Sequence, residues 1–127
     1  MGGMKKIIYN FYNKFKVNYK DGIYEFAIYS KKDACYFKIE LDGYDLIDLL
    51  LYIIYFIFLK MENFKIKKER LICHFPQKLL LLFEDNFFKI YIYSEIKGEH
   101  YYVYLYDREF KKFVYKLIKF YIRRGVL

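Results

Sequence analysis

The sequence is poor in the residues that enzymes and metal sites use most. Its 127 residues include two histidines, His74 and His100, and neither has an acid or a cysteine at metal-ligand spacing. The motifs GxGxxG, GxxxxGK and GxSxG are absent. Asp42, Asp45 and Asp48 lie three residues apart, but negative charge at a helix start explains them without a metal. We therefore expect no enzyme, no cofactor, no metal site and no small-molecule substrate.

Cysteines and long apolar runs are also scarce. Cys35 and Cys73 lie in strand-like contexts without CxxC spacing, which favours two buried, reduced thiols of an intracellular protein over a disulfide. The first residues lack a signal-peptide hydrophobic region and the serine or threonine of a myristoylation site. The apolar run at residues 49–59 has 11 residues, whereas about 20 are needed to span a bilayer. These absences predict a cytoplasmic protein without a transmembrane segment.

The composition supplies core material and positive charge. Apolar residues make up 57% of the chain, so folding requires neither disulfides nor metals. Alanine (two), proline (one) and arginine (four) are rare. This bias is typical of an A/T-rich genome, so the positions of tyrosine and lysine are more informative than their totals. The net charge of +8 favours a polyanionic partner or an anionic surface. Residues 65–127 carry 14 basic and 7 acidic groups, so the electrostatic footprint is expected mainly on the second half.

The chain contains an internal duplication. Residues 7–58 align with residues 71–122 at a constant offset of 64, with 10 identities in 52 positions. The pattern of apolar positions repeats more closely than the identities do. We predict one domain over residues 1–127, with repeat one at 5–60, a short basic connector at 61–70 and repeat two at 71–124.

Each repeat is predicted to contain four strands followed by one helix. Apolar and polar residues alternate with period two at 14–20, 24–29 and 36–41. Residues 5–12 supply a further strand, either separate from the next or continuous with it through a bend. Asp21-Gly22 and its equivalent Asp85-Asn86 are hairpin signals. The fold class is therefore α+β, a tandem ββββα repeat whose antiparallel sheets pack on helices.

An apolar stripe of helical spacing follows the strands in each repeat. Its residues in repeat one are Leu46, Leu49, Leu50, Ile53, Ile54 and Ile57. The equivalent residues in repeat two are Phe110, Phe113, Val114, Leu117, Ile118 and Tyr121. Asp42 or Asp45 can cap the N-terminus of the first helix, and Asp107 with Glu109 can do the same for the second helix.

The two helices differ on their opposite faces. The first helix carries Leu51, Tyr52, Tyr55 and Phe56 there, so it is apolar nearly all round and is expected to be buried on two sides. The second helix carries Lys112, Lys116 and Lys119 there and should be solvated. We therefore expect a central first helix and a peripheral second helix, with room for homodimerisation through the first.

The strand positions that alternate with the apolar set should face away from the helices. In repeat two these positions include Tyr91, Tyr93, Tyr102 and Tyr104, which form adjacent columns on neighbouring strands beside Lys89. Such a surface suits single-stranded nucleic acid, because bases stack on aromatic rings while lysines contact phosphates. Each stacked base contributes about 1–3 kcal/mol.

Other interpretations of this surface remain open. Tyrosine is a good strand former that an A/T-rich genome supplies freely, so the tyrosines can lack any specific role. Leu80 and Leu82 face outward by the same alternation, and Glu40 does so in repeat one. The leucines favour an oligomeric protein-interaction module without nucleic-acid binding. A further alternative is a membrane surface bound by the basic second helix.

The order strand, turn at Asp21-Gly22, strand, strand and Asp-opened helix (FKIELDGYDLIDLLLYII) resembles a known unit. The ββββα units of PUR-repeat proteins, Whirly proteins and the positive-coactivator-four transcription cofactors have this order. The resemblance lies in topology and turn placement and covers both repeats. It implies that the repeats intertwine into one domain that binds single-stranded DNA or RNA on its sheet surfaces. The matching positions are Lys16, Tyr29, Lys38, Lys89, Tyr91, Tyr93, Tyr102 and Tyr104.

Overall fold

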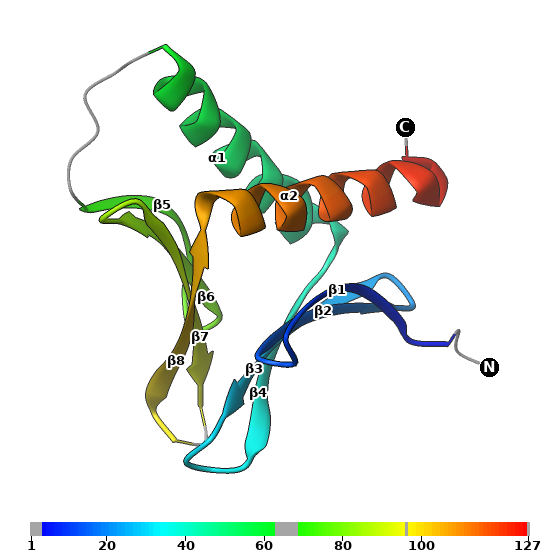
Figure 1. Cartoon of the computed structure of the whole chain (residues 1–127). Helices are drawn as coiled ribbons and strands as arrows, with labels where there is room; N and C mark the ends of the chain where they lie inside the picture. Colours follow the sequence, from blue (N-terminus) through cyan, green and yellow to red (C-terminus); the bar gives the residue numbers. More distant parts are fainter. Residues whose placement is uncertain (1–3, 63–68, 96, 127) are drawn as a thin grey trace.

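The computed structural model (Figure 1) describes residues 4–62, 69–95 and 97–126. It has an α+β architecture of two four-stranded antiparallel sheets, each followed by a helix. The first half contains β1 (Lys6–Phe11), β2 (Phe15–Lys20), β3 (Ile23–Ser30), β4 (Cys35–Leu41) and α1 (Gly43–Met61). The second half contains β5 (Glu69–Phe75), β6 (Leu79–Glu84), β7 (Phe87–Ser94), β8 (Glu99–Tyr106), α2 (Asp107–Tyr121) and the π-helical turn η1 (Ile122–Val126).

In both sheets the strand order follows the chain, β1-β2-β3-β4 in the first sheet and β5-β6-β7-β8 in the second. The first two strands of each half are separate rather than one bent strand, which answers the question that the sequence left open. The predicted connector at 61–70 falls largely on residues 63–68, which lie outside the described residues.

The two halves share irregular backbone features at the offset of 64. Each first strand has a register shift, between Ile7 and Tyr9 in β1 and between Leu71 and Cys73 in β5. Positive φ angles fall on equivalent turn positions, which are the pairs Asn13 and Gln77, Asp21 and Asp85, Gly22 and Asn86, and Ala34 and Gly98. Both predicted hairpins are confirmed, and the two consecutive positive φ angles in each are the signature of a type I′ turn. One ββββα plan is therefore present twice.

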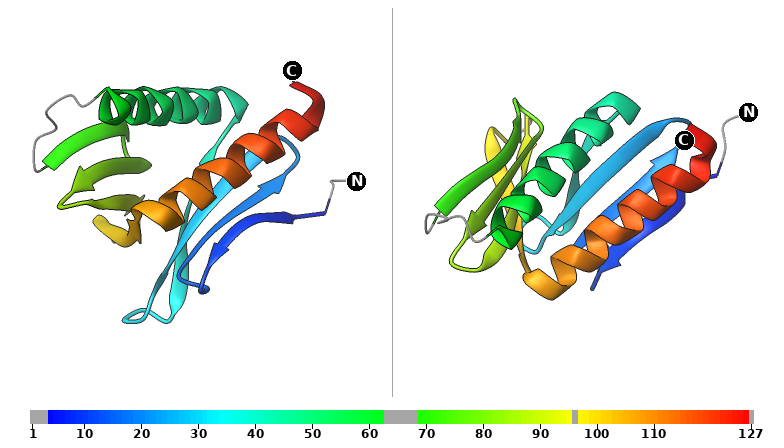
Figure 2. Two further views of the ribbon diagram at one scale, coloured as in Figure 1. Left: turned by 45° about the horizontal axis from the view of Figure 1, so that its top comes forward. Right: turned by 90° about the horizontal axis from the view of Figure 1, so that it is seen from above.

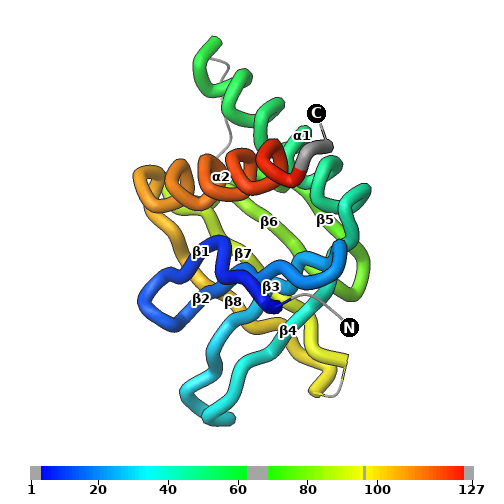
Figure 3. Tube along the Cα trace, turned by 90° about the vertical axis from the view of Figure 1, so that its right-hand side faces the viewer, coloured from blue at the N-terminus to red at the C-terminus, as the bar shows by residue number. Residues whose placement is uncertain are grey.

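The helices are exchanged between the halves. α1 lies across the second sheet and α2 across the first (Figure 2, Figure 3). Phe56 of α1 packs against Phe83 of β6 with ring centroids 5.2 Å apart, and the equivalent Phe120 of α2 packs against Tyr19 of β2 at 5.0 Å. Each sheet is thus covered by the other half's helix. The expectation of one central and one peripheral helix is wrong, because each helix covers one sheet.

Equivalent residues also meet where the two sheets touch. Phe37 of β4 stacks on Tyr101 of β8 with centroids 3.9 Å apart and planes 8° from parallel, and these two positions are related by the offset of 64. Asp33 and Lys97, another equivalent pair, form an ion pair of 3.5 Å. Contacts between equivalent residues mark a pseudo-twofold axis that relates the two halves. One continuous core of buried side chains includes residues from both.

Helix α1 buries a different stripe from the predicted one. Its buried residues are Leu46, Leu49, Leu50, Ile53, Phe56 and Leu59. Ile54 was predicted to face the core but is 48% exposed, whereas Phe56 was predicted on the opposite face and is 2% exposed. The run at 49–59 is apolar at every position, so its periodicity could not fix the orientation of the helix. Within the single chain Leu51, Tyr52 and Tyr55 are exposed, so the second half of the chain does not bury this face as expected of a central helix.

The predictions of the helix caps and of the two cysteines were partly right. Asp42 caps α1 by accepting a 2.8 Å hydrogen bond from the Asp45 backbone nitrogen, as predicted. No side chain caps α2, so the predicted capping role of Asp107 and Glu109 is wrong, although both lie in its first turn. Cys35 is exposed at the start of the edge strand β4, contrary to the prediction of a buried thiol. Cys73 is buried as predicted, and both thiols are free.

Candidate nucleic-acid interface

The outer faces of the sheets hold all eight predicted site residues. The inner faces meet each other through Phe37 and Tyr101 and pack under the helices, so the outer faces are turned away from the core. Repeat one contributes Lys16 from β2, Tyr29 from β3 and Lys38 from β4. Repeat two contributes Lys89, Tyr91 and Tyr93 from β7 and Tyr102 and Tyr104 from β8. The structure therefore places three of these residues on the first sheet and five on the second, and Lys38 and Tyr93, one from each sheet, line a common groove.

On the second sheet, four predicted residues form one group, which we call the Tyr–Lys cluster: Lys89, Tyr91, Tyr102 and Tyr104. The β7–β8 register places Lys89 opposite Tyr104 and Tyr91 opposite Tyr102. The Lys89 Nζ lies 4.9, 4.5 and 4.8 Å from the ring centroids of Tyr91, Tyr102 and Tyr104. Strand pairing thus brings three rings around one ammonium group.

The neighbouring tyrosine hydroxyls favour the charged form of Lys89. Interaction with Tyr104 and Tyr91 raises the pKa of Lys89 above its usual range. Each ammonium–ring contact adds about 0.5–1 kcal/mol at an exposed site. Tyr102 is 52% exposed and Tyr104 is 41% exposed. The cluster therefore presents a fixed positive charge between rings that solvent can reach.

The aromatic surface extends beyond the predicted residues at both ends. At one end Tyr93 packs on His100 at 5.2 Å between centroids, and His100 lies 6.0 Å from the Tyr91 ring of the Tyr–Lys cluster. At the other end, Phe87 packs on Tyr104 at 5.9 Å and on Tyr106 at 4.7 Å. Phe87 and Tyr106 were not predicted as site residues. The same period-two alternation, continued by one step along each strand, would have found them.

A smaller aromatic group lies on the outer face of the first sheet. Tyr29 packs on Tyr36 with centroids 5.1 Å apart, and the Lys16 Nζ lies 4.9 Å from the Tyr36 ring. Lys38 is separated from Lys16 by Ala27, which pairs with both, and instead lies 3.9 Å from a carboxylate oxygen of Glu25. Tyr36 pairs with Tyr29 on this face but was not predicted as a site residue. The first sheet thus holds a two-ring version of the Tyr–Lys cluster.

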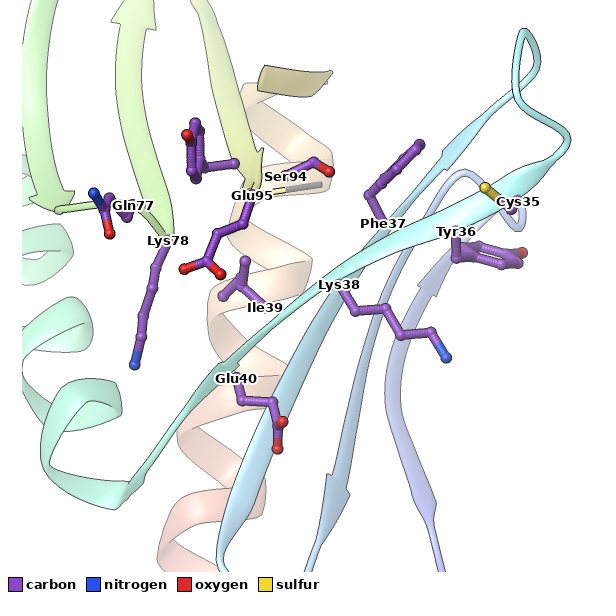
Figure 4. Close-up of a pocket in the computed structure, with 11 residues that line it drawn as sticks. Cys35, Tyr36, Phe37, Lys38, Ile39, Glu40, Gln77, Lys78, Ser94 and Glu95 are labelled. Atoms are coloured by element: carbon purple, nitrogen blue, oxygen red, sulfur yellow. The ribbon is translucent and has the colours of Figure 1, made fainter. Parts of the chain in front are cut away.

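An open groove of about 670 Å³ lies between β4 and the second sheet (Figure 4). Tyr36 and Lys38 project from one side of β4, and Phe37 and Ile39 from the other. Lysines and glutamates both line the groove, namely Lys38, Lys78, Glu40 and Glu95. Because the charges balance, this groove is a weaker candidate for a polyanion than the outer faces.

The positive charge of the second half is concentrated on α2. Lys111, Lys112, Lys116 and Lys119 are exposed there, and Lys112, Lys116 and Lys119 are solvated as predicted. Lys111 is 2.9 Å from Asp107, and Lys112 is 3.4 Å from Glu109. Among the described residues of β5–β8, Lys89 is the only lysine at a strand position that faces outward. Basic and aromatic residues are therefore largely on different surfaces.

The described residues hold no group of three or more histidine, cysteine, aspartate or glutamate side chains arranged to bind a metal ion. Neither of the described helices combines the length and apolarity needed to cross a bilayer.

The fold and the site define an α+β protein with a duplicated ββββα layout and solvent-facing aromatic groups on its sheets. Comparisons with protein families, with curated proteins and with solved structures find no match to the chain.

Proposed function

We propose that this protein binds single-stranded DNA or RNA, with bases stacked on the outer face of the second sheet. The observation that carries the proposal is the Tyr–Lys cluster, in which the Lys89 ammonium lies within 5 Å of three ring centroids. A base can stack on a half-exposed tyrosine ring, and the phosphate next to it can reach the ammonium. The exchange of helices between the halves is an intertwined arrangement, which is what the resemblance to PUR-repeat proteins implies.

The cluster favours single strands for a physical reason. In a duplex the bases stack on one another and their faces are not available, whereas in a single strand each base has a free face. Stacking is tolerant of sequence, because all bases have such a face, and contributes about 1–3 kcal/mol per base. The first sheet's Tyr29, Tyr36 and Lys16 form a second, smaller stacking group.

The number of lysines predicts the salt dependence. The affinity of a protein for a single strand falls as salt is added. A plot of log K against the logarithm of the salt concentration has a slope of about −0.7 for each phosphate that the protein neutralises. The Tyr–Lys cluster contains one lysine, so we expect a slope near −0.7 for this surface. Basic residues on α2 would give a much steeper slope, because four lysines are exposed there.

Fluorescence anisotropy with labelled single-stranded and double-stranded oligonucleotides tests the proposal. Tyr102→Ala with Tyr104→Ala should weaken single-strand binding by about 10-fold or more, since each lost stack costs at least about 1 kcal/mol. Lys89→Gln should reduce the salt slope by about 0.7. The matched control is the exposed helix pair Tyr115 and Lys119, whose Nζ lies 5.7 Å from the ring. Tyr115→Ala with Lys119→Gln should leave binding unchanged.

Equal binding by the wild type and by the Tyr102→Ala, Tyr104→Ala variant would exclude this site. Equal affinity for duplex and single strands would exclude the stacking mechanism.

A protein-interaction surface is the second candidate function. Leu71 is 53% exposed on the outer face of the second sheet, and Leu80 and Leu82 are half-buried there. These aliphatic side chains lie beside the tyrosines and would suit a protein partner. In that case, changing Leu71 and Leu82 to Ser would abolish association with the partner, and single-strand binding would be absent at all salt concentrations.

A further inference from the structure

Helix α1 has an exposed apolar face, which we call the α1 face. Its five residues are between 48% and 59% exposed, and they are Leu51, Tyr52, Ile54, Tyr55 and Phe58. Between Asp48 and Glu62 the helix sequence carries one charged residue, Lys60, which pairs with Asp107 at 3.6 Å. The α1 face is therefore uncharged along three turns of helix.

The second half of the chain provides an internal comparison for this face. Because α2 covers its sheet as α1 does, the offset of 64 relates each α1 position to one in the same surroundings on α2. The equivalents of Tyr52 and Tyr55 are Lys116 and Lys119, both exposed. The fold therefore tolerates lysine at these positions. Apolar residues on α1 are not explained by packing within the chain.

The size of the α1 face suits an interface. An aromatic side chain can bury about 150–250 Å², so three aromatic and two aliphatic residues, each about half exposed, present several hundred Å². Soluble monomers rarely expose a contiguous apolar patch above a few hundred Å². Two such faces together approach about 1,200 Å², the lower limit for a stable protein–protein interface.

We propose that the α1 face is a homodimer interface in which α1 packs on the α1 of a second copy across a twofold axis. A twofold interface requires a surface that complements itself. Leu51, Tyr55 and Phe58 have i, i+4, i+7 spacing and no charge, so this row can meet its own copy without burying an unpaired ion. A basic or acidic partner would find no complementary charge along it.

Acidic residues at the two ends of the α1 face determine the angle at which the two α1 helices can cross. Asp48 and Glu62 lie seven residues on either side of Tyr55, which is about 10 Å along the helix. Two antiparallel helices aligned along their full length would bring Asp48 of one copy to Glu62 of the other. A crossing of about 50° near Tyr55 separates these acids, and it is the commonest helix packing class. The remaining repulsion is screened by salt, so the dimer should strengthen as salt is added.

Sedimentation equilibrium of the full chain tests the proposal. The test variant carries Tyr52→Lys and Tyr55→Lys, which introduces on α1 the residues that α2 already carries. The wild type should be dimeric, and the variant should dissociate at least about 30-fold more readily, as expected for changes at an interface centre. The wild-type dimer should also tighten between about 0.05 and 0.5 M salt, in contrast to single-strand binding.

Tyr115→Lys is the matched control, because Tyr115 is 63% exposed at the equivalent of Leu51 on α2. This control should remain dimeric, and circular dichroism should show that both variants are folded. A monomeric wild type, or a Tyr52→Lys, Tyr55→Lys variant that stays dimeric, would overturn the proposal. A monomer that co-sediments with anionic phospholipid vesicles through this face would also overturn it and would identify a membrane surface instead.

Discussion

The exchange of helices predicts an energetic coupling between residues that are far apart in sequence. Phe113 of α2 packs edge-on against Phe15 of β2, with ring centroids 5.4 Å apart, and both side chains are at most 1% exposed. Aromatic pairs of this geometry contribute about 0.5–1.5 kcal/mol beyond their burial. Phe113→Leu and Phe15→Leu should each destabilise the protein by about 1–2 kcal/mol. The double variant should be destabilised by about 1 kcal/mol less than the sum of the two single destabilisations.

Urea denaturation of the four proteins measures this coupling as a difference in the free energy of unfolding. The control cycle pairs Phe113→Leu with Leu79→Ala, because Leu79 is the equivalent of Phe15 on the second sheet and is 3% exposed. Phe113 would contact Leu79 if α2 covered its own half's sheet. We expect the control cycle to be additive within about 0.5 kcal/mol. Additivity with Phe15 and coupling with Leu79 would refute the exchanged arrangement.

Three further predictions concern single side chains. Asp42→Ala should lower the free energy of unfolding by about 1 kcal/mol in urea, because it removes the cap of α1. Tyr9 donates a 2.8 Å hydrogen bond to Glu109, and this bond, followed by the nearby Lys112 charge, lowers the pKa of Glu109. The wild type should therefore be more stable than Tyr9→Phe above about pH 4.3, and this difference should disappear as the pH falls through the lowered pKa of Glu109. Urea denaturation of both proteins at several acidic pH values measures the difference. Cys35 should react with a thiol reagent in the folded protein, whereas Cys73, whose thiol pKa burial raises to about 12, should react only on unfolding.

Local features were predictable because each has a local cause. The hairpins at Asp21-Gly22 and Asp85-Asn86 follow from residues that accept positive φ, and the strands follow from period-two alternation. The same alternation, together with hairpin register, was sufficient to put Lys89 beside Tyr91 and Tyr104. The Tyr–Lys cluster is thus a consequence of strand pairing that sequence can reveal.

The orientation of α1 and the pairing of helices with sheets could not be derived from periodicity. In a run where every residue is apolar, the 3.6-residue period has no contrast, so Ile54 and Phe56 were assigned to the wrong faces. An amphipathic stripe predicts that a helix covers an apolar sheet but does not say which of two similar sheets it covers. The resemblance implied that the repeats intertwine, but it did not say which helix covers which sheet.

The exchange of helices also explains how the two halves could diverge. Since each sheet is covered by the other half's helix, the inner face of each helix must match strands of the other half, and the inner positions stayed apolar in both helices. The outer faces have no such constraint. On α2 the outer face is solvated by Lys116 and Lys119, whereas on α1 the same positions are tyrosines. The shared fold therefore does not require tyrosine at these outer positions, and this is the premise on which the proposed homodimer interface rests.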